Sequence, residues 1–236
     1  MGFLQDNLIP FFKKRSLVFR ESMQQSEDVY SFVFEKPSEL TWKPGQYGLF
    51  TITHKRVKQA TKPFSVSSIP SEGIVRMTTI IRDNPSAYKQ ALLELKPGMS
   101  VTLRGPVGPF YLTDHSPTLL IAGGIGITPF RSIVKQLAED GTKVAHPVHL
   151  LYIDSNQSYV FQDELDELAN QASILVTYVD VRADLQREID VFTSAHANNG
   201  KYLVAGSSAM TGDITTYLQQ KQIAKANIKK DVFMGY

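Results

Sequence analysis

Short runs of alternating or β-branched residues fill the first half of the chain and predict β-strands. Turn signals that combine proline or glycine with polar residues separate these runs, as in Lys36-Pro37 and Lys43-Pro44-Gly45. The runs that predict strands are residues 29–34, 48–53, 74–81 and 100–103. Residues 86–95 have a helical composition behind Pro85-Ser86 instead. The pattern therefore predicts an antiparallel β-barrel or sandwich that one helix interrupts.

The pattern changes after the glycine- and proline-rich loop at residues 105–109, where apolar runs begin to alternate with amphipathic segments. The predicted strands are residues 118–122, 148–153, 173–179 and 201–205, and the predicted helices lie near residues 129–139, 162–170 and 211–224. Such alternation is typical of a parallel sheet flanked by helices. We therefore predict two domains: an N-terminal antiparallel β-barrel over residues 1–113 and a C-terminal α/β domain over residues 114–236.

One glycine-rich turn stands out in the second half. An apolar run at residues 119–122 leads into Gly123-Gly124-Ile125-Gly126-Ile127-Thr128-Pro129. Glycines let backbone N–H groups approach a pyrophosphate, and the following helix N-terminus favours an anion. The position of Pro129 rules out the dinucleotide-binding spacing G-x-G-x-x-G. The segment predicts either a phosphate cradle or an ordinary tight turn that binds nothing.

A second informative segment, Lys62-Pro63-Phe64-Ser65-Val66-Ser67-Ser68, lies at a strand in the first half. A flavin needs a cation for its phosphate, an aromatic ring against its isoalloxazine and a hydroxyl near its reactive nitrogen. Lys62, Phe64 and Ser65 supply these three groups. The alternative is an ordinary strand with an edge lysine and an inward phenylalanine.

Composition narrows the range of functions. The 236 residues are 42% hydrophobic, which is enough for a core, and 25 basic against 23 acidic residues argue against nucleic acid as a partner. The absence of cysteine excludes disulfides and cysteine-ligated clusters from these residues. Five scattered histidines predict no metal site, and no apolar run is long enough to span a membrane. We expect a cytoplasmic protein. Its apolar segment at residues 3–12 either packs on the body or touches a partner or membrane.

Five motifs occur in an order that resembles the ferredoxin-NADP reductase family of flavin and nicotinamide oxidoreductases. The resemblance covers the chain from about residue 16, and several ordered motifs are more specific than any one. The motifs are Pro44-Gly45-Gln46-Tyr47, Lys62-Pro63-Phe64-Ser65, Gly105-Pro106-Val107-Gly108, residues 123–129, and Gly206-Ser207-Ser208-Ala209-Met210. The resemblance implies that residues 1–113 bind flavin and residues 114–236 bind NAD(P).

The resemblance implies a flavin site in the first half. Phe64 would lie against the ring, Ser65 would contact its reactive edge near N5, and Lys62 would contact a phosphate or ribityl oxygen. Pro63 and Val66 complete this segment. In FAD-binding relatives a helix start holds the pyrophosphate, and the matching residues are Ser86, Tyr88 and Lys89. The alternatives are that Ser86 only caps its helix and that FMN replaces FAD.

The resemblance also implies a nicotinamide nucleotide site in the second half. The residues expected there are Gly123, Gly124, Gly126 and Thr128 at the pyrophosphate, Asp154 and Asn156 at the adenosine ribose, and Gly206 and Met210 at the nicotinamide. Phe233 or Tyr236 would cover the flavin and take part in catalysis. Asp154 would repel a 2′-phosphate whereas Arg182 could attract one, so NADH is only weakly favoured as electron donor.

The implied activity is hydride transfer from NADH or NADPH to FAD N5, followed by electron delivery to a separate acceptor. That acceptor is a ferredoxin- or flavodoxin-like protein or a small molecule. Three departures from the family pattern support an alternative. Lys62 replaces arginine, Phe64 lacks a hydroxyl, and Ala205 stands where many members have cysteine. The alternative is a flavin- or nucleotide-binding subunit of a larger redox complex without turnover of its own.

Overall fold

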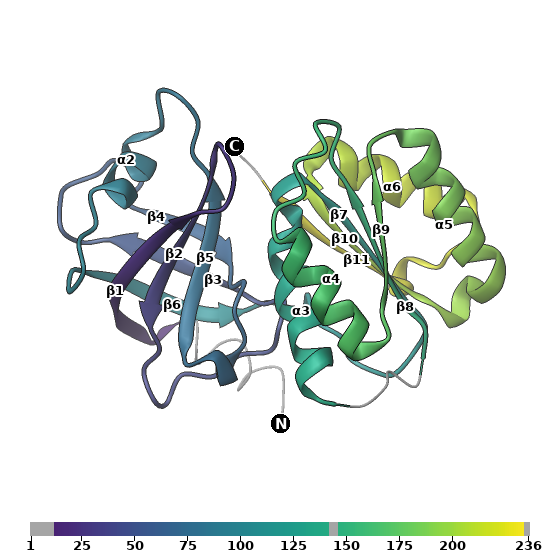
Figure 1. Ribbon diagram of the computed structural model, residues 1–236, viewed down its shortest axis with the longest axis horizontal. Helices are drawn as coiled ribbons and strands as arrows, with labels where there is room; N and C mark the ends of the chain where they lie inside the picture. Colours follow the sequence, from purple (N-terminus) through teal and green to yellow (C-terminus); the bar gives the residue numbers. More distant parts are fainter. Residues whose placement is uncertain (1–11, 142–145, 234–236) are drawn as a thin grey trace. The chain divides into compact units, whose positions relative to one another are not determined.

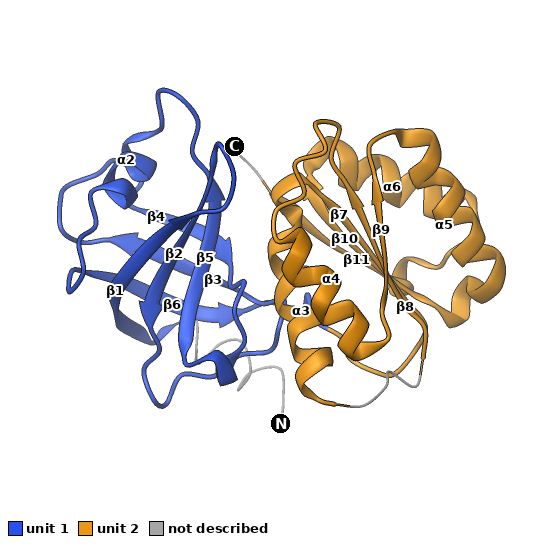
Figure 2. Ribbon diagram, in the orientation of Figure 1, with its two compact units in different colours: residues 1–111 blue, residues 112–236 orange. Residues whose placement is uncertain are grey.

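A computed structural model describes residues 12–141 and 146–233 and divides the chain into two compact units, Met1–Tyr111 and Leu112–Tyr236 (Figure 2). The division lies two residues before the boundary predicted from the sequence. The apolar segment at residues 3–12 lies outside the described residues except for Phe12, which is exposed. Tyr236 also lies outside them.

Unit 1 is a six-stranded antiparallel sheet in the order β4-β3-β6-β1-β2-β5. A bridge between Val66, next to β4, and Met77 in β5 connects the two edges of the sheet, which makes it a barrel. The strands are β1 (Lys14–Gln24), β2 (Val29–Glu35), β3 (Tyr47–Ile52), β4 (Thr61–Ser65), β5 (Ile74–Ile80) and β6 (Ser100–Val107).

The barrel interior is filled by the side chains that point inward from the strands, at every second position along a strand. Phe32 and Phe34 of β2 are fully buried, and the rings of Phe34 and Phe19 meet edge to face at 5.7 Å. The helix α2 (Ala87–Leu93) adds Tyr88 and Leu92 to the same core. The helix expected at residues 86–95 is thus confirmed as α2, and the structure adds that it packs against the barrel core.

Unit 2 is a five-stranded parallel sheet in the order β11-β10-β7-β8-β9 with helices on both faces (Figure 1). Its strands are β7 (Thr118–Gly123), β8 (Val148–Ile153), β9 (Leu175–Val179), β10 (Lys201–Ser207) and β11 (Ile228–Phe233). Its helices are α3 (Ile127–Glu139), α4 (Gln162–Ala172), α5 (Arg182–His196) and α6 (Ser208–Gln220). The predicted fold class, an antiparallel barrel followed by a parallel α/β sheet, is confirmed.

The two faces of this sheet bury different residues of β7. Leu119 and Ile121 join a core formed with the apolar faces of α5 and α6. On the other face α3 packs beside α4. Since every position from Leu119 to Ala122 is fully buried, β7 is the central strand of a sheet covered on both sides.

Four elements differ from the sequence prediction. The strands β1 and β11 and the helix α5 were not predicted, and residues 105–107 continue β6 instead of forming a loop. In α5 the apolar stripe is narrow, with Leu185, Ile189 and Phe192 buried among charged residues. In β11 the charged run Lys229-Lys230-Asp231 interrupts the alternation of apolar and polar residues that predicts a strand. These segments are ordered by the partners they pack against and not by a strong local signal.

Candidate functional site

The carboxyl ends of the parallel strands in unit 2 meet at one edge of the sheet. There β7 ends at Gly123, β8 at Ile153 and β10 at Ser207. The strand order reverses at β7, because the chain continues through β8 to β9 on one side and returns to β10 on the other. Ligands of open α/β sheets bind outside the carboxyl ends at such a reversal.

A pocket of about 470 Å³ opens at this edge, a volume within the range of ligand sites. Its polar lining comes from Asp154, Ser155, Arg182, Gln186, Ser207 and Asp213. Its apolar lining comes from Ile153, Leu185, Ile189, Ala209, Met210, Ile214 and Tyr217, and Gly123 and Gly124 add open backbone. An apolar wall beside a few polar groups suits a flat aromatic group carried on a polar chain.

The glycine-rich turn lies beside this pocket and leads into α3. Gly124 begins a short 3₁₀ turn, Gly124–Gly126, with a φ of 51°, a conformation that glycine adopts without strain. Gly126 is buried against the backbone of Ala205, where a Cβ would overlap the carbonyl group. The hydroxyl of Thr128 donates to the carbonyl oxygen of Ile125 at 3.1 Å. Gly123 and Gly124 therefore face the pocket, while Gly126 and Thr128 shape the turn from inside.

Met210 occupies a slot that two glycines leave open. A Cβ on Gly123 would overlap the Met210 sulfur, and a Cβ on Gly206 would lie 3.0 Å from it. The hydroxyl of Ser207 caps α6 by accepting from the Met210 backbone N–H at 3.2 Å. These contacts hold a polarizable side chain in the pocket wall.

Asp154 follows β8 directly and is held by its own loop. Its Oδ1 accepts from the backbone N–H groups of Asn156 at 2.9 Å and Ser158 at 3.4 Å. Its backbone N–H donates to the carbonyl oxygen of Val179 at 3.0 Å. Asp154 thus lines the pocket, whereas Asn156 is exposed outside the lining and supports Asp154 through its backbone.

The segment expected to contact flavin lies in β4 of unit 1. The half-buried ring of Phe64 stacks on Tyr88 with centroids 5.8 Å apart and meets Phe50 edge-on at 6.0 Å. Pro63 is exposed, whereas Ser65 is buried and Val66 fully so. The contacts of Phe64 with the core fix the orientation of its ring.

Three cations lie near the start of α2. Lys62 Nζ donates to Gln59 Oε1 at 2.8 Å, and Arg82 Nε donates to Asp28 Oδ2 at 3.1 Å. Burial lowers the pKa of Lys89, and the charges of Arg82 and Lys62 lower that pKa further while Asp28 raises it. A site where cations repel one another is favourable for a phosphate. The sequence prediction included Lys62 and Lys89 but missed Arg82, which no motif marks.

Two side chains at this helix already have internal partners. The hydroxyl of Ser86 accepts from the Lys89 backbone N–H at 3.4 Å, so the capping role is observed, and its contact with pyrophosphate stays a prediction. Tyr88 donates to the carbonyl oxygen of Phe50 at 3.1 Å, and burial raises its pKa. Tyr88 therefore supports Phe64 from within the core.

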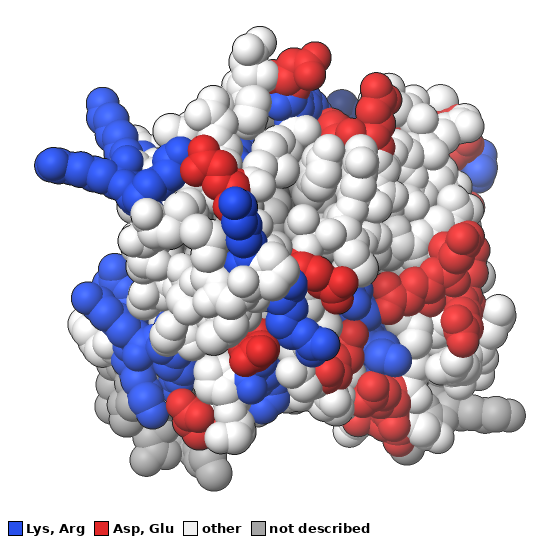
Figure 3. Space-filling view, turned by 60° about the vertical axis from the view of Figure 1, so that its left-hand side comes forward, with Lys and Arg blue, Asp and Glu red and all other residues white. Residues whose placement is uncertain are grey.

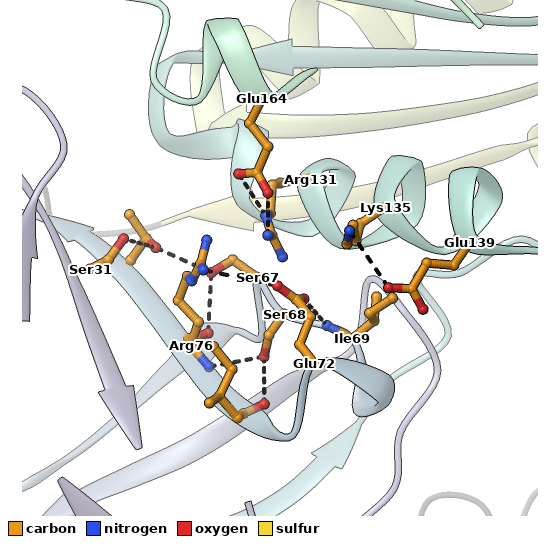
Figure 4. Close-up of polar contacts among 12 residues, drawn as sticks. Ser31, Ser67, Ser68, Ile69, Glu72, Arg76, Arg131, Lys135, Glu139 and Glu164 are labelled. Atoms are coloured by element: carbon orange, nitrogen blue, oxygen red, sulfur yellow. Dashed lines mark hydrogen bonds and ion pairs between the residues drawn. The ribbon is translucent and has the colours of Figure 1, made fainter. Parts of the chain in front are cut away.

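Buried hydroxyls anchor the chain after Ser65 (Figure 4). The Ser67 and Thr78 hydroxyls lie 3.2 Å apart, and the Ser31 and Thr78 hydroxyls 2.8 Å. Ser68 Oγ donates to the carbonyl oxygen of Ile74 and accepts from the backbone N–H of Arg76, both at 3.0 Å. Such satisfied networks rigidify the segment that carries Ser65.

A partly buried ion pair connects α3 to α4 in unit 2 (Figure 4). Arg131, on the helix that the glycine turn begins, is 1% exposed and donates from Nε and Nη2 to the two carboxylate oxygens of Glu164. Two parallel bonds fix both position and orientation. The pair therefore fixes the helix that begins at the glycine turn against its neighbour.

The net charge of only +2 comes from many groups of both signs. In the view of Figure 3 lysine and arginine side chains and carboxylates are both exposed on the surface. No helix among the described residues is long and apolar enough to cross a membrane. The same part of the chain holds no cluster of three side chains suited to bind a metal ion.

Residues 120–216 match the family model described as an oxidoreductase NAD-binding domain. The toluate 1,2-dioxygenase electron transfer component of Pseudomonas putida is 34% identical over 152 residues, which are 62% of this chain and 43% of that protein. The 2-halobenzoate 1,2-dioxygenase electron transfer component of Burkholderia cepacia is 28% identical over 86% of this chain and 62% of its own. The chain thus spans about half the length of these relatives.

Solved structures match over nearly the whole chain. The flavohem-like FAD/NAD binding domain of nitric oxide dioxygenase from Vibrio cholerae is 25% identical, covers 93% of this chain and 98% of its own, and gives a TM-score of 0.74. Ferredoxin-NADP+ reductase from Plasmodium falciparum, at 16% identity, gives 0.78 over 93% of this chain and 96% of its own, which shows the shared fold. Motif order, the two-unit fold and these relatives agree: the chain resembles the ferredoxin-NADP reductase family over nearly its whole length.

Proposed function

We propose that the chain is an NAD(P)H-dependent flavin oxidoreductase that binds FAD on unit 1 and a nicotinamide dinucleotide on unit 2. The observation that carries the proposal is the pocket at the strand reversal of unit 2. It combines open glycine backbone at Gly123 and Gly124, a carboxylate at Asp154 and an apolar wall. Each of these features suits a different part of a dinucleotide.

The residues of this pocket fit the dinucleotide from one end to the other. Backbone N–H groups around Gly124 and the start of α3 suit the pyrophosphate. The Asp154 carboxylate suits the ribose hydroxyls, since Asn156 and Ser158 hold it in place. Leu185, Ile189 and Ile214 offer an apolar surface for the adenine. Gly206 and Met210 remain the residues proposed for the nicotinamide.

Unit 1 fits a flavin. Lys62, Arg82 and Lys89 bring positive charge to the start of α2, which suits the two phosphates of FAD more than the single phosphate of FMN. The preorganised ring of Phe64 suits an aromatic face, and Ser65 remains the residue proposed for the reactive edge. When bound, flavin supplies the ability to take a hydride and to release electrons singly or in pairs.

Phe233 is the proposed aromatic cover. It ends β11 beside Ser207, half-buried at the carboxyl edge of the same sheet as the pocket. A side chain at the end of an edge strand can move at less cost than one inside the core. Tyr236 keeps the same predicted role.

The proposed acceptor is a separate component. Because the 236 residues contain no cysteine, they hold no cysteine-ligated iron–sulfur cluster. The relatives named above are electron transfer components of dioxygenases. A small redox protein or an oxygenase component is therefore proposed as the partner, and a small acceptor such as a ferric chelate is the alternative. The cytoplasmic location expected from the sequence stays a prediction.

The experiment begins with purified protein reconstituted with FAD, freed of excess flavin and examined by absorption spectroscopy. Anaerobic titration with NADH and with NADPH then follows bleaching of the flavin band. Rapid bleaching by either donor is expected. A protein that retains neither FAD nor FMN and oxidises neither donor would contradict the proposal. Tight flavin binding without bleaching would instead support the subunit without turnover.

The class of acceptor is tested with the same reduced protein. Reduction of a ferredoxin or flavodoxin that slows as salt rises indicates a docked protein partner, because such encounters are steered by charge. Reduction of ferric citrate or free flavin at a rate independent of salt indicates a small acceptor.

A further inference from the structure

An ion pair lies across the dinucleotide pocket of unit 2. Arg182, the first residue of α5, places Nη1 3.1 Å from Oδ2 of Asp213 in α6. Both side chains line the pocket, and so does Asp154 at the end of β8. These are the charged residues among its lining, and their formal charges sum to −1.

This arrangement changes what Arg182 can recognise. An arginine at a dinucleotide site offers a fork of donors to a 2′-phosphate, which carries about −1.5 to −2 charges at neutral pH. Here the guanidinium is already paired with a carboxylate. The side chains of Arg182 and Asp213 are 67% and 55% exposed, so the pair is open to water and weak enough to separate. Asp213 therefore acts mainly through its charge, which offsets that of Arg182 at the pocket.

We propose that Asp213 is a specificity residue that makes NADH the preferred electron donor. It pairs with Arg182 and, together with Asp154, leaves the pocket negative where a 2′-phosphate would add more negative charge. A ribose with two free hydroxyls carries no charge at this position, so it meets no such repulsion. Asp154 accepts hydrogen bonds from those hydroxyls. This inference rests on the proposed function, since it assumes that the pocket binds the adenosine end of the donor.

The test compares Asp213→Asn with the wild-type chain. Dissociation constants for NADH, NADPH, AMP and 2′-phospho-AMP are measured by calorimetry at low and moderate salt. In the wild-type chain NADH and AMP are expected to bind at least tenfold more tightly than their 2′-phosphorylated counterparts. In the variant the discrimination is expected to fall about tenfold, the effect of removing one charge about 6 Å from a doubly charged phosphate in water. Salt should weaken this effect.

Two further variants distinguish the effect of charges that line the pocket from the effect of charges elsewhere on unit 2. Asp184→Asn removes a carboxylate from the first turn of α5 that pairs with Arg187 and does not line the pocket. It should leave the discrimination unchanged. The double variant Arg182→Gln with Asp213→Asn should lose most of the gain in 2′-phospho-AMP binding, since the released guanidinium is then absent.

The outcomes distinguish this inference from the proposed function. Equal discrimination in Asp213→Asn and the wild-type chain would overturn the inference, as would tighter binding of 2′-phospho-AMP than of AMP by the wild-type chain. Either result leaves flavin reduction intact. A chain whose flavin neither NADH nor NADPH reduces would contradict the proposed function, while the ratio of AMP to 2′-phospho-AMP affinity would still test the pocket.

Discussion

Gly126 lies directly against the backbone of Ala205 in β10, so closely that a Cβ on residue 126 would overlap the carbonyl group. The φ of Gly126 is −60°, so its backbone conformation does not require glycine. Close packing requires glycine here, because the atoms that a Cβ would meet belong to the backbone of a buried strand. Unlike the end of a flexible side chain, this backbone cannot move away. This contact fixes the start of α3 against the sheet at the edge where the pocket opens.

Gly126→Ala should therefore destabilise unit 2 and weaken dinucleotide binding. Forcing a methyl group into a packed interior costs about 1–3 kcal/mol of unfolding free energy. Displacement of the turn should also move the backbone of Gly124 and raise the dissociation constant for NADH. Urea denaturation and calorimetry measure the two effects.

Gly212→Ala is the matched control. Gly212 lies inside α6, and a Cβ there would meet nothing within 4 Å. Because alanine favours helix over glycine, this variant should be stabilised by up to about 1 kcal/mol. Equal stability and NADH affinity in the two variants would show that the contact with Ala205 carries no strain.

The sequence predicts the two sheets because hydrophobic periodicity reports burial directly. It also locates the glycine turn, since several glycines between a buried strand and a helix indicate a tight turn or a close approach of the backbone. The walls of the pocket escape prediction because they come from α5 and α6. Residues such as Leu185 and Asp213 reach the glycine turn only through the tertiary fold. Likewise nothing local shows that the Tyr88 hydroxyl bonds to Phe50.

Glu164→Gln should destabilise unit 2 through Arg131. The Arg131 side chain is almost fully buried, so loss of the carboxylate removes a counter-charge from a buried guanidinium. Breaking a buried pair from one side costs about 3–5 kcal/mol. Because Glu164 is 33% exposed and water can approach, we expect about 2–3 kcal/mol. Thermal and urea denaturation measure the loss.

Glu167→Gln provides the comparison on the same helix. Glu167 is exposed, and the hydrogen bond that it accepts from Gln171 is long at 3.3 Å and therefore weak. Its substitution should change the unfolding free energy by less than about 0.5 kcal/mol. If both variants lose the same stability, the Arg131–Glu164 pair does not hold α3 and α4 together.

His149 should make unit 2 less stable in mild acid. It is buried in β8, its Nε2 lies 2.9 Å from the Thr177 hydroxyl, and burial lowers its pKa while Glu188 partly opposes this. The unfolded chain therefore binds a proton more readily than the folded chain. Stability is complete above the unfolded pKa of about 6.5 and falls as pH drops below it, until the folded pKa is passed.

His149→Gln keeps a hydrogen-bonding group for Thr177 and removes the titration. The variant should lose less stability between pH 7 and pH 5 than the wild-type chain, as measured by urea denaturation at a series of pH values. His115→Gln, which removes an exposed histidine, should follow the wild-type curve. Identical pH dependence in the wild-type chain and His149→Gln would exclude His149 as the cause.

Lys62 tests the proposed flavin site. A lysine meets a phosphate as a point charge, whereas arginine would bind two oxygens at once, so Lys62→Arg should tighten FAD binding. Lys62→Ala should weaken FAD binding about tenfold through loss of one charge-assisted hydrogen bond. Lys58→Ala, which removes an exposed lysine nearby in sequence, should leave the affinity unchanged. Riboflavin, which has no phosphate, should bind all these variants alike. Equal losses for riboflavin and FAD in Lys62→Ala would place Lys62 away from the phosphates.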